Sequence, residues 1–315
     1  MSTARNIESD RGLSTRMFFT GLFLVLLYGV FTSVLWALGI GFILIAVIVV
    51  GLLSVQYWFS DRIALWGMHG KIVTEEQAPA LHGAIDRLCA LADMPKPRVA
   101  IADTDVPNAF ATGRSPKAAV VCATTGLLRR LNDQEVEAVL AHELSHVAHR
   151  DVAIMTIAST LGVIAGLTTR AMFYAGLFGG GGRNNQSGGQ IAALEGGVML
   201  VSIVVYAISF LLTRALSRYR ELAADRSGAI LIGRPSTLAS ALVKVTGEIG
   251  KIPTRDLRKA EPFNAFFFTP AIAQRNPSSG GSQGFTLSRL FSTHPPLEQR
   301  LAQLADLEAR IGGAR

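Results

Sequence analysis

The longest apolar stretch in the sequence covers residues 17–60, which contain no charged side chain. One membrane-spanning helix needs about 20 apolar residues, so this stretch is long enough for two. The turn between them is expected near residues 37–41, where two glycines occur. Tyr57, Trp58 and Phe59 end the stretch, as aromatic residues do at membrane interfaces. The pattern predicts a transmembrane hairpin over residues 17–60, after a polar N-terminal segment at residues 1–16.

Two more apolar segments, residues 152–169 and 196–213, each run for 18 residues without a charge. This length is within the range of about 17–25 residues for membrane-spanning helices. Residues 170–195 separate them and include a glycine-rich stretch at 179–189, which is typical of a flexible loop. The pattern predicts a third and a fourth span joined by an external loop. The alternative is a pair of buried helices in a soluble core.

The remaining residues, 61–151 and 214–315, mix polar and apolar positions as globular domains do. Their expected elements are helices at residues 75–92, at 125–131, from Asn132 or Asp133 onward and at 297–311, and strands at residues 98–102, 109–112 and 118–124. The expected fold class is therefore a mainly α-helical membrane protein whose transmembrane helices carry an α+β domain made of two parts.

Composition supports the membrane prediction. Half of the chain is hydrophobic and 17% is charged, whereas soluble proteins carry about 25% charged residues. The net charge of +7 is mostly arginine next to the apolar segments, as expected near anionic lipid. No basic stretch is interleaved with aromatic residues, so nucleic acid is not an expected partner. Two cysteines, Cys89 and Cys122, are too few for a disulfide framework.

The strongest chemical signal is the H-E-x-x-H pattern formed by His142, Glu143 and His146. Residues four apart lie on one face of a helix about 6 Å from each other, so both imidazoles can reach one Zn²⁺ ion. Glu143 would lie beside the open coordination position, where it could accept a proton from water. The alternative for this short pattern is a solvated helix face with two ordinary histidines.

A catalytic zinc site usually has three protein ligands. His149 lies on the same helical face, but three ligands on one straight helix would spread over about 10 Å and could not share an ion. Glu221 and Asp225, four residues apart on a predicted helix, are better candidates. Glu221 could complete a His₂Glu site, and Asp225 could accept the second ring N–H of a ligand histidine. Spacing alone leaves open an ordinary solvated face.

The chain resembles the HtpX family of membrane zinc endopeptidases, gluzincins related to the CAAX prenyl protease. The resemblance rests on four motifs in order: NAFA at 108–111, HELSH at 142–146, SRYRELAAD at 217–225 and STHPPLEQR at 292–300. With the N-terminal hydrophobic hairpin, it covers nearly the whole chain.

This resemblance implies one Zn²⁺ ion per chain and a zincin-like fold for the α+β domain. The roles it implies are zinc ligation by His142, His146 and Glu221, general-base catalysis by Glu143, ligand orientation by Asp225, substrate pairing by Asn108 and Ala109, and oxyanion support by His294 and Arg300. The alternative for His294 is a structural role where a helix begins, because two prolines follow it.

Topology and chemistry constrain each other. His146 and Glu221 must lie on the same side of the membrane to hold one ion, and two apolar segments separate them. Either both segments span or neither does. Arginines flank the first, second and fourth predicted spans on the side of the catalytic residues. The positive-inside rule therefore predicts a multi-pass protein of a bacterial cytoplasmic (inner) membrane, with its catalytic domain facing the cytoplasm.

The motif predicts peptide-bond hydrolysis, and the resemblance implies proteolytic quality control. Expected partners are the lipid bilayer and misfolded, damaged or unfolded polypeptides, membrane proteins above all. Two alternatives stay open. One is a prenyl-protein-type processing protease with the same chemistry, and the other is a membrane protein that binds metal without hydrolysis. The second alternative would have no use for Glu143, which is not a ligand in the expected site.

Overall fold

The computed structural model describes residues 11–37, 47, 50–51, 53–55, 57–178, 185–251 and 292–313. Its helices are α1 (Arg11–Ala37), α3 (Ser60–Gly67), α4 (Pro79–Ala92), α5 (Thr125–Arg130), α6 (Asp133–Ala148), α7 (Asp151–Phe178), α8 (Asn185–Ile232), α9 (Pro235–Lys251) and α12 (Leu297–Gly313). Its strands are β1 (Gly70–Ile72), β2 (Arg98–Ala102), β3 (Ala109–Thr112) and β4 (Val120–Thr124). The fold is mainly helical with a small mixed sheet, as expected.

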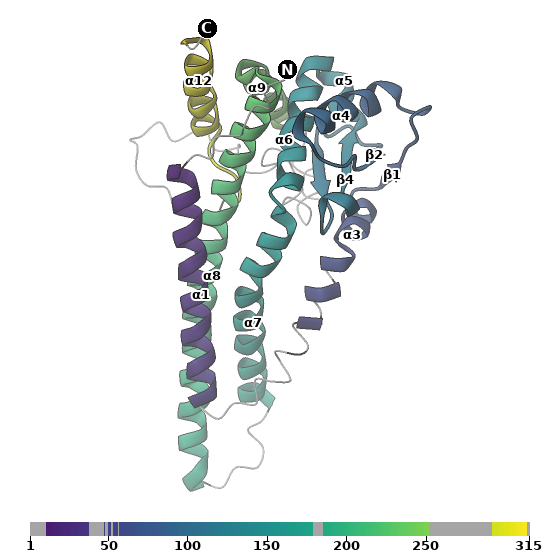
Figure 1. The fold of residues 1–315 in the computed structure, drawn as a ribbon. Helices are drawn as coiled ribbons and strands as arrows, with labels where there is room; N and C mark the ends of the chain where they lie inside the picture. The colour runs from purple at the N-terminus through teal and green to yellow at the C-terminus, as the bar shows by residue number, and fades with distance from the viewer. Residues whose placement is uncertain are drawn as a thin grey trace.

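Three of the described helices are long and apolar enough to cross a membrane, by length and composition. These candidate spans are Thr15–Ser33 in α1, Asp151–Ala171 in α7 and Gly196–Ile232 in α8. The three helices lie side by side and extend away from the part that contains the sheet (Figure 1). The expected hairpin turn at residues 37–41 lies, after Ala37, outside the described residues.

The loop expected at residues 170–195 is shorter in the structure, because α7 continues to Phe178 and α8 begins at Asn185. The apolar residues after Arg170 include no proline, so nothing stops α7 there. Gly188 and Gly189 lie within α8. Glycine inside a helix costs only about 1 kcal/mol relative to alanine, which neighbouring turns can offset.

The sheet has the strand order β1-β2-β4-β3. β1 pairs with β2 and β3 pairs with β4 in antiparallel register, whereas β2 and β4 are parallel. All three predicted strands are present, the third shortened because residues 116–118 form a 3₁₀ turn. One face of the sheet packs on the large core formed with α4 and α6, and the other covers a smaller core with α3. Because β3 is the last strand in the order β1-β2-β4-β3, it is an edge strand, and it contacts α6.

Helix α6 is fixed at its start by a capping box. The Asn132 side chain accepts a hydrogen bond from the Glu135 N–H, and the Glu135 carboxylate accepts one from the Asn132 N–H. Glu135 is almost fully buried and also accepts hydrogen bonds from Ser240 Oγ (2.7 Å) and Lys244 Nζ (2.9 Å) of α9. The cap predicted at Asn132 thus also ties α6 to α9.

This network predicts an acid-sensitive contribution to stability. Burial raises the pKa of Glu135, but hydrogen bonds from Lys244, Ser240 and Asn132 outweigh it and leave the pKa below its ordinary value. A lowered pKa means that the stabilisation is present above the ordinary carboxyl pKa and is lost as the pH falls. We expect Glu135→Gln, which keeps a capping side chain, to lower the free energy of unfolding by about 1.5–3 kcal/mol at pH 7.

The check is thermal or denaturant unfolding of both proteins in detergent from pH 7 to about pH 3, a range that extends well below the ordinary glutamate pKa of 4.5. The difference between wild type and Glu135→Gln should shrink as the pH falls. A difference that stays constant over this range would show that the charge of Glu135 does not contribute.

Candidate metal centre

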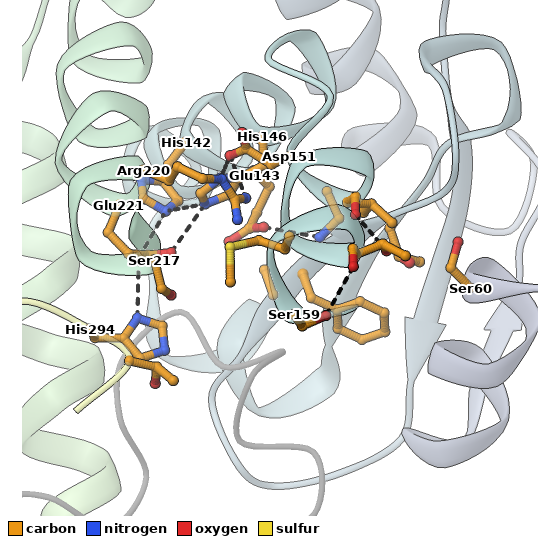
Figure 2. Close-up of a pocket in the computed structure, with 18 of the residues that line it drawn as sticks. Ser60, His142, Glu143, His146, Asp151, Ser159, Ser217, Arg220, Glu221 and His294 are labelled. Carbon is orange, nitrogen blue, oxygen red and sulfur yellow. Dashed lines mark hydrogen bonds and ion pairs between the residues drawn. The ribbon is translucent and has the colours of Figure 1, made fainter. Parts of the chain in front are cut away.

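Helices α6 and α8 bring together three side chains that can bind a metal ion. The ligand atoms of His142, His146 and Glu221 all lie within 4.8 Å of one another. Nε2 of His142 is 3.2 Å from Nε2 of His146, and the Glu221 carboxylate oxygens lie 3.8 and 3.4 Å from these two nitrogens. The imidazole rings meet almost perpendicularly, at an interplanar angle of 89°. The three residues expected to be ligands therefore converge on one point (Figure 2).

The donor set fits a zinc ion. Tetrahedral bonds of about 2.0–2.1 Å place neighbouring ligand atoms about 3.3 Å apart, close to the spacings observed. Each Nδ1 of His142 and His146 is next to a carboxylate, at 2.9 Å from Asp225 and 2.5 Å from Asp151. If each Nδ1 donates its proton there, both Nε2 atoms direct lone pairs toward the same point. The two Nε2 lone pairs and the Glu221 carboxylate repel one another unless a cation lies between them, so this arrangement favours a bound metal ion.

Asp225 lies behind His142, as the resemblance implied, and the structure adds its partner. Arg300 of α12 donates from Nε and Nη2 to the two Asp225 oxygens, both at 2.6 Å. Asp225 is fully buried and Arg300 is 1% exposed. The three side chains thus form a buried chain from α12 through α8 to α6, which holds the His142 ring in place.

Asp151 holds the His146 ring in place in the same way that Asp225 holds the His142 ring. It is the first residue of α7, is 3% exposed, and also pairs with Nη2 of Arg220 of α8 at 2.6 Å. No role for Asp151 was predicted from the sequence. The available signal was an acidic residue five positions after the second histidine, immediately before an apolar segment. The start of a candidate span is therefore coupled directly to the metal ligands.

We expect Asp151→Asn to weaken metal binding by about 10–100-fold, because residues that orient metal ligands commonly contribute this much. Competition with a chromophoric chelator measures the affinity. Asp133→Asn, an exposed change in the first turn of α6, is the matched control and should bind metal as wild type does. Equal affinities for the two variants would contradict the role given to Asp151.

Charge and burial act in opposite directions on the protonation of these groups. Burial raises the pKa of the Glu143 carboxyl to about 8. Burial lowers the pKa of His146, but its hydrogen bond with Asp151 and the charge of Glu221 raise that pKa to about 9. Burial lowers the pKa of His142 despite its contact with Asp225. A cation on the Nε2 atoms competes with their protons and favours ionised Glu143.

Glu143 connects the ligand helix to the edge of the sheet. Its Oε2 accepts a hydrogen bond of 3.0 Å from the backbone N–H of Ala111 in β3. A cavity of about 320 Å³ lies here, lined by the three ligands, Glu143, all of β3 and the first turns of α7, together with Ser217, Arg220 and His294. The arrangement places around one space a buried carboxylate, a metal-binding set and an edge of β3 that pairs with no other strand in the described part of the chain.

The remaining predicted site residues fall into two groups. Ala109 and His294 line the cavity, and Nδ1 of His294 is 3.2 Å from Glu221 Oε2. Asn108 is fully buried, and its backbone pairs with Thr124. Among the described residues that line the cavity, neither Asn108 nor Arg300 is present. Arg300 pairs with Asp225 and its Nη1 lies 3.8 Å from Glu221 Oε2, so the geometry places it behind the expected metal ligands and not in the cavity lining.

A single glycine allows α8 to approach α6 closely enough for this site. A Cβ atom at Gly228 would lie 2.8 Å from the His142 backbone nitrogen and 3.0 Å from the Ala141 carbonyl carbon. Backbone atoms cannot yield at such distances, so any side chain here would push the helices apart. Gly228 is three residues after Asp225 and therefore sets the distance between Asp225 and His142.

The site can be compared with known proteins. A sequence model of peptidase family M48 matches residues 75–308. The chain is 58% identical to protease HtpX homolog 1 of Streptomyces coelicolor, over 98% of this chain and 96% of the relative. It is 51% identical to a protease HtpX homolog of Moorella thermoacetica, over 98% of both. The crystal structure of S. mikatae Ste24p is similar in fold, with a TM-score of 0.54 and 17% identity over 92% of this chain and 67% of that one.

Proposed function

The chain belongs to peptidase family M48, and from this premise we propose that it is a zinc endopeptidase that cleaves misfolded or damaged membrane proteins. The observation that carries the proposal is the convergence of His142, His146 and Glu221 beside Glu143 and the edge of β3. This set lies where two candidate spans, in α7 and α8, meet the globular part. A site in that position is within reach of polypeptides that emerge from a bilayer.

Zinc bound there would polarise the scissile carbonyl and lower the pKa of a water molecule to about 7. The residues of the chain supply the rest. Glu143 holds Oε2 against the Ala111 N–H, which leaves Oε1 to take a proton from the attacking water and pass it to the leaving amine. His294 lies on the Glu221 side of the cavity, where its ring can donate to a developing oxyanion.

The edge of β3 supplies a binding surface for extended substrate. The Asn108 C=O accepts a hydrogen bond from the Thr124 backbone N–H, and the Asn108 N–H donates to Thr124 Oγ1. Because backbone direction alternates along an antiparallel strand, the polar groups of Ala109 and Ala111 face away from β4 and toward the cavity. A peptide that pairs with this edge would present a bond to the metal-binding set. Ala111 therefore joins Ala109 as a pairing position, and the buried Asn108 instead supports the strand from behind.

Charge supports an orientation in the membrane. Arg16 lies at the start of the first candidate span, Arg62 follows the apolar stretch at residues 17–60, and Arg214 and Arg218 lie where α8 reaches the globular part. Such a distribution favours the cytoplasmic side for the end that holds the metal-binding set. We therefore place the catalytic part at the cytoplasmic face of a bacterial inner membrane.

Metal analysis of detergent-purified protein, combined with cleavage of unfolded casein and of a destabilised membrane protein, tests the proposal. We expect about one zinc per chain, loss of cleavage after chelation and recovery when zinc is added back. A protein that retains zinc but cleaves neither substrate would be a metal-binding protein instead. Cleavage confined to prenylated C-terminal peptides would identify the processing-protease alternative. A folded, unrelated membrane protein is the negative control.

A further inference from the structure

A second cavity, of about 500 Å³, lies between α7 and α8 within the two candidate spans. Its lining includes Ser159, Gly162 and Gly166 of α7 and Tyr206, Ser209 and Thr213 of α8. We call this cavity the α7/α8 groove. The α7 residues are spaced by three and four, so they form one face of that helix. From Ser159 to Arg170, the last α7 residue that lines it, the groove extends about 17 Å along the helix axis.

The α7/α8 groove adjoins the cavity of the metal centre. Ser159 lines both spaces, and Figure 2 shows it on the side of the metal-centre cavity away from His142. Met155 and Thr156, one turn earlier on the same face of α7, line only the metal-centre cavity. One face of α7 therefore leads from inside the candidate span to the catalytic residues.

The chemistry of the groove suits a helix better than a lipid chain. Ser209 is fully buried, and its Oγ has no hydrogen-bond partner among the residues that the structure describes. An acyl chain cannot satisfy this hydroxyl, whereas a polar group on a transmembrane helix can. Gly162 and Gly166 lie on the α7 side of the groove, where a Cβ on either would lie 3.4 Å from Ser209 Oγ or the Tyr206 ring of α8, so these glycines let α7 and α8 pack closely. Small residues of this kind let helix backbones approach closely in membranes.

We propose that the α7/α8 groove binds a membrane-embedded helix of the polypeptide substrate, whose adjoining extended segment then pairs with β3. The inference rests on the proposed function, because it assigns the substrate of that same site. The groove is as long as about 11 residues of helix at 1.5 Å per residue, and its volume of about 500 Å³ receives one face of such a helix. A helix held there leaves the bilayer beside Ser159, next to the space that β3 and Glu143 border.

The test compares two substrates with the same cleavable segment. One is a free casein-derived polypeptide, and the other carries it directly after a single leucine-rich membrane helix of about 20 residues. Val163→Trp adds bulk inside the groove, where Val163 is 39% exposed. Val204→Trp is the matched control on α8, because Val204 is 48% exposed and is not part of the groove lining.

We expect Val163→Trp to lower the ratio of kcat/KM for anchored over free substrate by about tenfold, because the added indole occupies the space that the substrate helix would fill; this change is a difference of about 1.4 kcal/mol. Val204→Trp should leave that ratio unchanged. An unchanged ratio in Val163→Trp would overturn the inference. Because the readout is a ratio, a partly folded variant does not mimic the expected result.

A second measurement separates this inference from the proposed function. A photo-crosslinker at position 163 of Glu143→Gln protein, in vesicles, should capture the anchored substrate, whereas one at position 204 should not. Crosslinks only to lipid or only to a second copy of the chain would overturn the inference. If wild type cleaves neither substrate, the proposed function fails, while crosslinking still reports whether a membrane helix enters the groove.

Discussion

Replacing Glu143 by glutamine is expected to lower kcat for casein cleavage by about 10²–10⁴-fold while zinc remains bound. Proton transfer by a positioned side chain contributes this range of rate enhancement. Glutamine keeps the shape of glutamate and can still accept the Ala111 N–H, so the contact between α6 and β3 survives. It cannot take up a proton from water. The ligand atoms of His142, His146 and Glu221 are untouched, which is why metal content should not change.

Steady-state kinetics together with zinc content measured on the same protein sample checks this prediction. Glu137→Gln is the matched control, because Glu137 lies on the same helix but pairs with Arg87 and Arg234, away from the cavity. It should cleave casein at the wild-type rate. Wild-type turnover by Glu143→Gln would rule out Glu143 as the proton acceptor, and loss of zinc would mean that the substitution disturbs the ligands.

Replacing Arg300 by methionine is expected to destabilise the fold by about 3–5 kcal/mol, the usual effect of leaving a buried charge without its partner. The pair of 2.6 Å hydrogen bonds to Asp225 is fully shielded from water. Methionine fills much of the arginine volume, so the effect isolates the lost charge. The melting temperature in detergent should fall, and metal binding should weaken because Asp225 no longer orients His142.

Two further variants sharpen this prediction. Arg310→Met, an exposed change on the same helix, should melt like wild type. Arg300→Met combined with Asp225→Asn removes both charges and should recover part of the lost stability, since replacing both partners costs less than replacing one. If Arg300→Met alone melts like wild type, the buried pair is not a structural element of the site.

Local signals predicted much of the fold. The strands at residues 98–102 and 109–112 and the helix that begins after Asn132 depend on short-range patterns, and the structure confirms all three. The metal-binding set was also predictable, since a helix fixes the spacing of His142 and His146 and a motif marks Glu221. The three-residue β1 was missed, because its few residues show no alternation and depend on pairing with β2.

The rest depended on tertiary contacts. Nothing near Arg300 in the sequence shows that its partner is Asp225, 75 residues away. Asp151 looked like the polar boundary of an apolar segment, and only the folded arrangement of α6 and α7 brings it to His146. The α7/α8 groove likewise needs two helices to exist. The predicted fourth span ends at residue 213, where Arg214 ends the apolar run, and α8 continues past it to Ile232 because charged side chains on an exposed face do not end a helix.

The continuity of α8 makes it a lever with its fulcrum at Gly228, where it touches the α6 backbone. At 1.5 Å per residue, Glu221 lies about 10 Å from this fulcrum and Gly196, where the candidate span begins, about 48 Å. A sideways displacement of about 5 Å at the far end thus shifts Glu221 by about 1 Å, well beyond the roughly 0.2 Å tolerance of a metal–ligand bond. The packing of α1 and α7 along α8 therefore helps to hold Glu221 in position relative to His142 and His146.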